Sequence, residues 1–139
     1  MEEVEYTMNK LIFPQTRLTI VAALATLADT DFQQQVWLGR QAAISGKCYN
    51  FDEVLHCIYD DSGLDDGPST CIGYFLYNPE EASSLQALMT QIDLLLERHG
   101  KRLPDDAYLR APQWPDIVAS AKSTLTLFQN NDRRFQGGG

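Results

Sequence analysis

The residues whose types are best suited to do chemistry are the carboxylates in the middle of the chain. The 139-residue sequence has 11 Lys or Arg and 19 Asp or Glu, for a net charge of −8, yet no Lys or Arg occurs between residues 48 and 97. A nucleic-acid binder needs positive charge to neutralise phosphates, so this stretch argues against direct nucleic-acid binding and favours a basic protein partner. Its acidic residues are Asp52, Glu53, Asp60, Asp61, Asp65, Asp66, Glu80, Glu81, Asp93 and Glu97.

A loop inside this acidic stretch carries two Asp pairs, which raises the question of a calcium site. An EF-hand loop needs ligands at alternating positions, Gly at the sixth position and Glu at the twelfth. Counting from Asp61 puts Asp66 and Ile72 at the sixth and twelfth positions, and counting from Asp60 puts Leu64 at the fifth. Neither register fits, so we expect the acids of this loop to be solvated or to meet a cationic partner.

Four further side chains, Cys48, His56, Cys57 and Cys71, could serve metal or nucleophilic chemistry. The sequence has no C-x₂-C pair, and adjacent His56 and Cys57 point to different sides of a helix or a strand, which argues against zinc. It also lacks a G-x-S-x-G turn, a G-x-G-x-x-G loop and a phosphate-binding loop. We therefore expect no catalytic residue, no metal and no cofactor. The alternative is a small metal-dependent hydrolase that uses His56 with nearby Asp residues.

The cysteine count and the N-terminus bear on the compartment. Three cysteines without repeat spacing suit reduced thiols better than a disulfide framework. Residues 1–5 lack the basic segment and apolar run of a secretion signal, and no apolar run approaches the ~18 residues of a membrane span. These features predict a cytoplasmic protein that contacts no membrane.

The elements that must position the acidic residues are predicted from apolar periodicity. A helix is expected from Pro14 with Thr16 as its cap, and Asp29-Thr30-Asp31 then begins a second short helix. Residues 51–59 favour a helix that Asp52 caps, with a buried strand as the alternative.

The clearest helix of the sequence follows Asn78. Asn78 is a good N-cap, Pro79 suits the first helical position, and Gly100 supplies the stop. A last helix is expected from Pro115, with Trp114 sealing its start.

The remaining segments are short. Residues 71–77 suit a helical turn or a short strand, residues 105–109 a turn, and residues 1–12 a frayed arm or a short edge strand. Because most connections are short, we predict an all-α antiparallel bundle of about five to six helices in a single domain over residues 1–136. Residues 137–139 are expected to form a flexible Gly tail.

A set of short motifs spans most of the chain. It consists of Arg17, Leu24-Ala25, Leu27-Ala28-Asp29, Trp37, Ile58-Tyr59-Asp60-Asp61, Ile72-Gly73, Glu80-Glu81-Ala82, Leu85, Leu88, Tyr108-Leu109, Pro112, Trp114, Val118 and Ala121. In this combination the chain resembles, over about residues 15–128, a family of small acidic bacterial proteins that are mostly labelled hypothetical. No catalytic residues are known for that family, so the resemblance implies none here.

In size, charge and lack of recognisable chemistry, the chain is also similar to immunity proteins of contact-dependent inhibition and type VI secretion systems. This second resemblance rests on no motif. It implies a protein that neutralises a basic toxin, most plausibly a nuclease, by covering its active site; a purely solvated acidic face is the alternative. The expected charge contacts and aromatic anchors are Asp52, Glu53, Asp60, Asp61, Asp65 and Asp66, with Tyr59 and Tyr74.

Overall fold

The computed structural model is mainly helical in the part of the chain that it describes. That part comprises residues 11–38, 48, 50–60 and 67–135. It contains no β-strand, and a single isolated bridge pairs Ile72 with Leu76. The prediction of an all-α bundle is confirmed.

Two terminal predictions lie outside the described residues. They are the short strand, expected from the alternation of Val4, Tyr6 and Met8, and the flexible tail at residues 137–139. Residues 11–13 are described and form no strand, although the N–H groups of Ile12 and Phe13 donate to carbonyls of the segment after η4.

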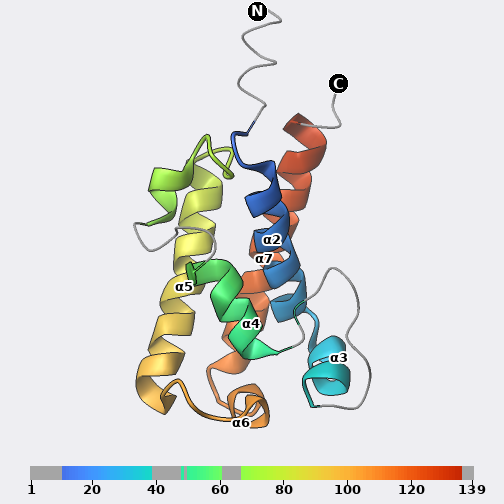
Figure 1. Ribbon diagram of the computed structural model, residues 1–139, viewed down its shortest axis with the longest axis vertical. Coiled ribbons are helices and arrows are strands. Elements are labelled where there is room, and N and C mark those ends of the chain that lie inside the picture. Colours follow the sequence, from blue (N-terminus) through green and yellow to red (C-terminus); the bar gives the residue numbers. More distant parts are fainter. Residues whose placement is uncertain (1–10, 39–47, 49, 61–66, 136–139) are drawn as a thin grey trace, which may run out of the picture.

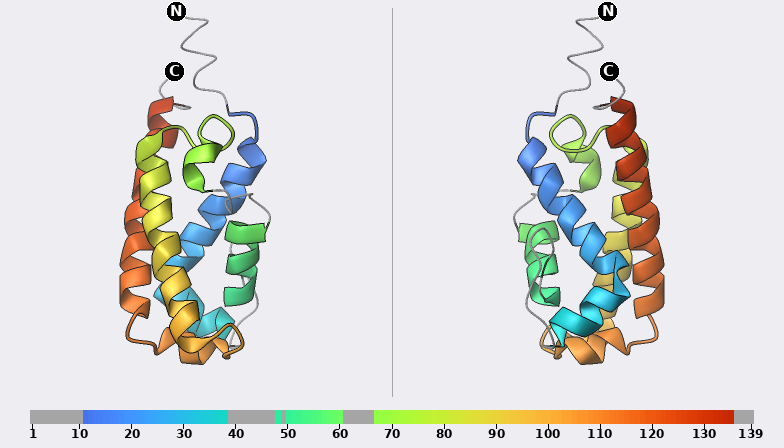
Figure 2. Two further views of the ribbon diagram at one scale, coloured as in Figure 1. Left: turned by 90° about the vertical axis from the view of Figure 1, so that its left-hand side faces the viewer. Right: turned by 90° about the vertical axis from the view of Figure 1, so that its right-hand side faces the viewer.

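Three long helices form the body of the bundle (Figure 1): α2 (Pro14–Ala28), α5 (Pro79–His99) and α7 (Trp114–Phe135). Helix α7 packs against both α2 and α5 and runs opposite to each of them (Figure 2). Helices α2 and α5 point the same way, because the chain returns along α4 before α5 begins. The predicted antiparallel packing therefore describes the two interfaces of α7.

Six shorter helical elements of the described chain connect and cover these helices. The predicted helix at residues 51–59 is present, and its second half continues as a π-helical turn. The short elements are α3 (Thr30–Phe32), the π-helical η1 (Gln33–Trp37), α4 (Phe51–Leu55), the π-helical η2 (His56–Asp60), the 3₁₀-helical η4 (Pro68–Cys71) and α6 (Asp105–Leu109).

The observed starts of α2 and α4 contradict two of the predicted caps. Helix α2 begins at Pro14 directly after Phe13 and has no side-chain cap, so the cap predicted at Thr16 is wrong. A proline at the first helical position lacks the N–H that would otherwise need a partner, which reduces the need for a cap. The new start at Asp29 is confirmed, because its carboxylate accepts from the Phe32 N–H at 3.0 Å.

Helix α4 is capped by Asn50 and not by Asp52. The Asn50 side chain accepts from the Glu53 N–H at 2.7 Å, which leaves Asp52 in the first turn with its carboxylate in solvent. The caps predicted for α5 are confirmed: Asn78 accepts from the third residue of the helix, and Gly100 ends it with a φ of 86°.

An aromatic cluster closes the end of the bundle where α6 and the start of α7 meet α4. Phe51 packs on Tyr108 and Trp114, with ring centroids 4.8 and 5.3 Å apart, and Trp114 meets Trp37 at 5.9 Å. All four residues are buried. The expectation that Trp114 seals the start of the last helix is thus confirmed.

A buried glutamine joins the same region to the end of α2. The Gln33 amide donates to the carbonyls of Thr26 and Leu27 at 2.8 and 3.0 Å, and its oxygen accepts from Trp114 Nε1 at 3.1 Å. Because helix ends leave carbonyls without partners, Gln33 terminates α2 and fixes it to α7 in one step.

Candidate functional site

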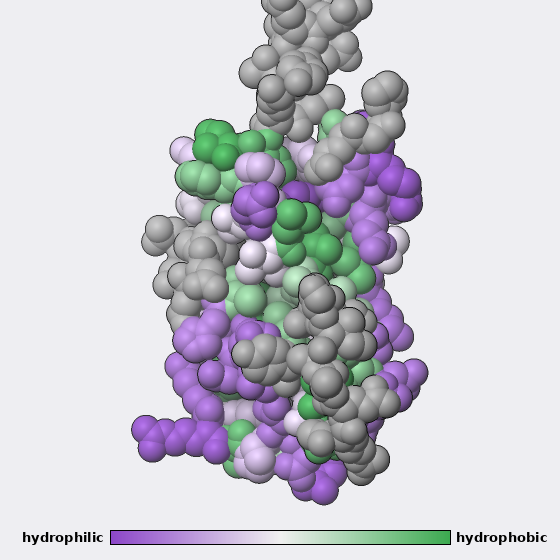
Figure 3. All heavy atoms as spheres, turned by 45° about the vertical axis from the view of Figure 1, so that its right-hand side comes forward, coloured by the Kyte–Doolittle hydropathy of each residue, from purple (hydrophilic) through white to green (hydrophobic). Residues whose placement is uncertain are grey.

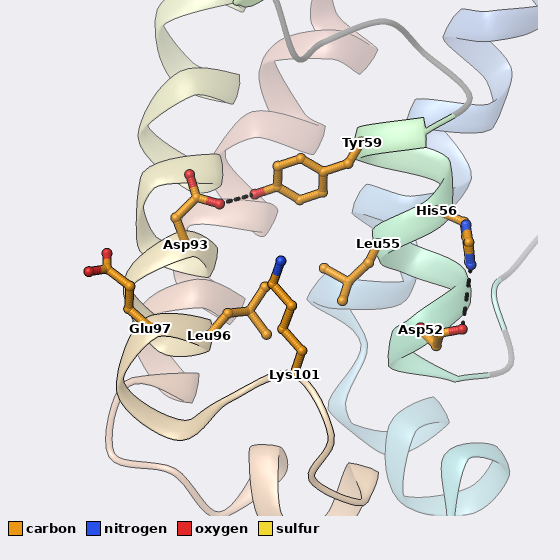
Figure 4. Close-up of a pocket in the computed structure, with 8 residues that line it drawn as sticks. All are labelled: Asp52, Leu55, His56, Tyr59, Asp93, Leu96, Glu97 and Lys101. Carbon is orange, nitrogen blue, oxygen red and sulfur yellow. Dashed lines mark hydrogen bonds and ion pairs between the residues drawn. The ribbon is translucent and has the colours of Figure 1, made fainter.

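An open hollow of about 640 Å³ lies between the α4–η2 element and the second half of α5 (Figure 4). It is held in place because η2 is tied to α5: Tyr59 Oη donates to Asp93 Oδ1 at 2.8 Å and to the Met89 carbonyl at 3.2 Å. The lining residues are Asp52, Leu55, His56, Tyr59, Asp93, Leu96, Glu97 and Lys101.

The middle of the hollow is apolar and its surroundings are charged. Leu55 and Leu96 lie on facing elements, and the Lys101 ammonium points into the space between them and Asp93 (Figure 4). The carboxylate of Glu97 points outwards from α5 in the same view. The lining residues include three acids and one lysine, so the lining is net negative. Such a surface attracts cations and offers apolar contact to an aliphatic chain.

Asp52 and His56 lie on the opposite side of α4 from the apolar floor (Figure 4). The distance from Asp52 Oδ2 to His56 Nε2 is 3.6 Å, and the two side chains are 81% and 59% exposed. At this exposure an ion pair one helical turn apart contributes little to stability. In the described part of the chain, no group of three or more His, Cys, Asp or Glu could hold a metal ion.

The structure brings two of the predicted contact residues to the hollow, Asp52 and Tyr59. Glu53 is half-buried on α4 and does not line it, and the backbone of Asp60 ends η2. Three further predicted contacts lie outside the described residues, namely Asp61, Asp65 and Asp66.

Tyr74 lies apart from the hollow, on an apolar surface at the start of α2. Its ring stacks on Phe13 with centroids 5.8 Å apart, and its carbonyl accepts from the Phe13 N–H at 2.7 Å. Two further apolar residues near Phe13 in the sequence are exposed: Ile12 is 63% exposed and Leu18, in the first part of α2, is 61% exposed. Figure 3 shows hydrophobic residues gathered in the upper half of this face, over the first part of α2. Tyr59 and Tyr74 therefore do not share the hollow.

Asp93 and Glu97 belong to the predicted acidic stretch but were not expected as contact residues. The signal that could have found them is their spacing of four residues on the helix predicted after Asn78, which puts them on one exposed face. Leu96 and Lys101 had no such signal, because their position at the hollow depends on how α4 docks on α5.

A second charged cluster is buried in the body of the bundle and centres on Arg17. Its guanidinium donates to both carboxylate oxygens of Glu81 at 2.8 Å and to Asp132 Oδ1 at 2.9 Å. The guanidinium carbon lies 4.4 Å from the ring centroids of both Tyr77 and Phe128. Burial alone disfavours the charged form, but Glu81 and then Asp132 outweigh it and raise the pKa of Arg17 above its ordinary value.

The carboxylate of Glu81 has other donors as well. It accepts from the Tyr77 N–H and from the Asn131 side chain, both at 2.9 Å. Arg17 and Glu81 are 2% and 0% exposed, so no ligand reaches them in this structure. The cluster joins α2, α5 and α7, and its role is structural.

The fold and the hollow together define a small helical protein whose candidate site is a surface and not a buried centre. No helix of the described chain is long and apolar enough to span a membrane. The chain belongs to a family described as a domain of unknown function, DUF7945, whose model matches residues 11–135. No curated protein and no solved structure matches it. The family match extends beyond the expected residues 15–128, and its description says nothing of toxins or immunity.

Proposed function

We propose that this protein is an immunity protein that binds a basic toxin, a nuclease, through the acidic hollow between α4–η2 and α5. The observation that carries the proposal is the surface hollow itself: Asp52, Asp93 and Glu97 are among its lining residues, and Leu55 and Leu96 form its apolar floor. Carboxylates of this kind complement the basic groove with which a nuclease holds phosphates.

The geometry favours a long cationic side chain of the toxin as the group that enters. Its aliphatic stem would lie on Leu55 and Leu96, as amphipathic Lys and Arg chains commonly do. Because the Lys101 ammonium points into the same space, Lys101 would turn outwards as the charged end reaches Asp93. Because the carboxylates are solvated in the free protein, they would mainly accelerate association and fix the register.

The test uses the gene that neighbours this one, which the proposal expects to encode the toxin, with its product made in the same cells. Cells that also produce the protein are expected to survive. Replacing Asp52, Asp93 and Glu97 together by Asn, Asn and Gln should slow association about tenfold and weaken its salt dependence, as measured by stopped flow. The matched control is Glu80→Gln, which removes an exposed charge from the other end of α5.

Two outcomes contradict the proposal. One is that the neighbouring gene encodes a metabolic enzyme, or a toxin from which the protein gives no protection. The other is that the triple variant associates as fast as the wild type, which would exclude the hollow as the contact surface.

The alternative function is a metal-dependent hydrolase, for which the proximity of Asp52 and His56 is the supporting observation. A stoichiometric metal in the purified protein, lost in His56→Ala, would favour this alternative over the binding protein.

A further inference from the structure

Two thiols lie close together behind one wall of the hollow. The distance from Cys48 Sγ to Cys57 Sγ is 3.9 Å, although the residues belong to different segments of the chain. Cys57 is part of η2, next to the lining residue His56. We propose that Cys48 and Cys57 form an intramolecular disulfide when the protein meets a small disulfide such as oxidised glutathione. The pair is then a site of oxidation next to the α4–η2 element that lines the hollow.

Cys48 is held in position by its own backbone. Its N–H donates to Thr26 Oγ1 at 2.9 Å, and its carbonyl accepts from Trp37 Nε1 at 3.0 Å. Thr26 and Trp37 are themselves buried in α2 and η1. The backbone of Cys48 is therefore fixed relative to the core by contacts that do not involve Cys57.

Cys57 is the more accessible of the two thiols. It is half-buried against the core, whereas Cys48 is 3% exposed. A disulfide has an S–S distance of roughly 2.05 Å, so closing the gap requires each sulfur to move by about 1 Å. A small rotation of both side chains supplies a movement of this size.

The exposure difference sets the order of the chemical steps. The Cys57 thiolate, its proton released to solvent, attacks one sulfur of the small disulfide; that S–S bond breaks and one small thiolate leaves. The Cys48 sulfur then attacks the Cys57 sulfur of the mixed disulfide, its proton passes to the departing small thiolate, and the second small thiol is released. The two protein thiols are oxidised and one small disulfide is reduced, so the electrons balance.

Cys48 is suited to the second step and not to the first. Burial, and then the neighbouring Cys57, raise the pKa of Cys48 to about 12, so few thiolates form there in bulk solution. The second step also needs the Cys48 thiolate, and the high effective concentration of a sulfur 3.9 Å away offsets the small thiolate fraction.

The third cysteine provides an internal control. Cys71 is 6% exposed in η4, and its sulfur contacts the Gly67 carbonyl and Thr70 Oγ1 at 3.9 and 3.8 Å. It should stay reduced under conditions that oxidise the other pair.

The experiment equilibrates the full chain in glutathione buffers of increasing oxidised fraction and stops thiol exchange with acid. Remaining thiols are then alkylated with a maleimide in denaturant at near-neutral pH, and mass and peptide linkage are determined. We expect a loss of two hydrogen atoms in mass, a linked peptide containing Cys48 and Cys57, and full alkylation of Cys71. The oxidised protein should also melt a few degrees higher, because the link closes a short loop of the unfolded chain.

Two variants make the assignment specific. Cys48→Ser, a small change that keeps the backbone contacts, should accumulate glutathione at Cys57, and Cys71→Ser should oxidise like the wild type. The proposal is overturned if wild-type Cys57 retains glutathione while Cys48 remains alkylated, if Cys71 is linked instead, or if oxidation yields only dimers between chains. Whether this disulfide forms does not depend on whether the protein binds a toxin.

Discussion

The buried pair of Arg17 and Glu81 gives the sharpest test of how the bundle is held together. Their side chains are 3% and 0% exposed, and two parallel hydrogen bonds of 2.8 Å join them. Removal of one partner leaves a buried charge without its counter-charge, which costs about 3–5 kcal/mol. Arg17→Met and Glu81→Leu should therefore each remove a large part of a stability that is typically about 5–15 kcal/mol.

The structure also predicts which single variant is worse. In Arg17→Met, the Glu81 carboxylate keeps only the Tyr77 N–H and the Asn131 amide as its donors among the contacts described above. In Glu81→Leu, the Arg17 guanidinium keeps the carboxylate of Asp132 and two aromatic faces. We therefore expect Arg17→Met to cost more than Glu81→Leu.

The double variant separates the pair from its surroundings. With both charges replaced by apolar side chains, neither buried ion is left alone, so the double variant should cost no more than the worse single variant. The coupling energy is then at least the cost of the milder single variant, about 3 kcal/mol, well above the ~0.5 kcal/mol within which independent sites add.

The assay is urea unfolding followed by the fluorescence of Trp37 and Trp114, which are buried and become exposed on unfolding. All four proteins are measured at the same sucrose concentration, since an excluded osmolyte lets a marginal variant still show a transition. Additive single and double effects, or single costs below about 1 kcal/mol, would refute the claim that this pair is a buried unit.

Two further predictions concern a helix cap and a titrating carboxylate. Asn78→Ala removes the cap of α5 and should cost about 1 kcal/mol of stability, measured as a lower urea midpoint. Gln129→Ala, on the exposed face of α7, should leave the midpoint unchanged. Equal midpoints for the two variants would contradict the role of the cap. Burial, with repulsion from Asp52 and Asp106, raises the pKa of Asp105 above its ordinary value of 3.8. The ionised form of Asp105 therefore destabilises the folded protein above the raised pKa, so Asp105→Asn should be a few tenths of a kcal/mol more stable at neutral pH. This gain should shrink as the pH falls through that pKa. A gain that is independent of pH would rule out this cause.

Features with local signals were predictable from the sequence. Helix α5 has its cap at Asn78, a proline at its first position and a glycine at its end, and each of these acts within a few residues. The burial of Trp37 and the seal formed by Trp114 likewise follow from large aromatic side chains near helix ends.

Features that depend on distant partners were not predictable. From the local sequence, an arginine near the start of a helix is expected at the surface. The partners that allow Arg17 to be buried, Glu81 and Asp132, lie 64 and 115 residues away. The π-helical turn η2 has no distinct apolar period, so the sequence shows only a helix there. The hollow arises from the docking of η2 on α5 through Tyr59 and Asp93, which neither segment specifies alone.

The position of α7 in both main interfaces has a consequence for synthesis. Among the described helices α2 leaves the ribosome first and α7 last, and Arg17 waits for a partner 115 residues further along the chain. At translation rates of about 5–20 residues per second, that delay is roughly 6–23 seconds. Until α7 follows, the buried residues of α2 lack the helix that covers them in the folded protein. The nascent chain thus passes through a period in which chaperones can bind the very surface that later becomes the core.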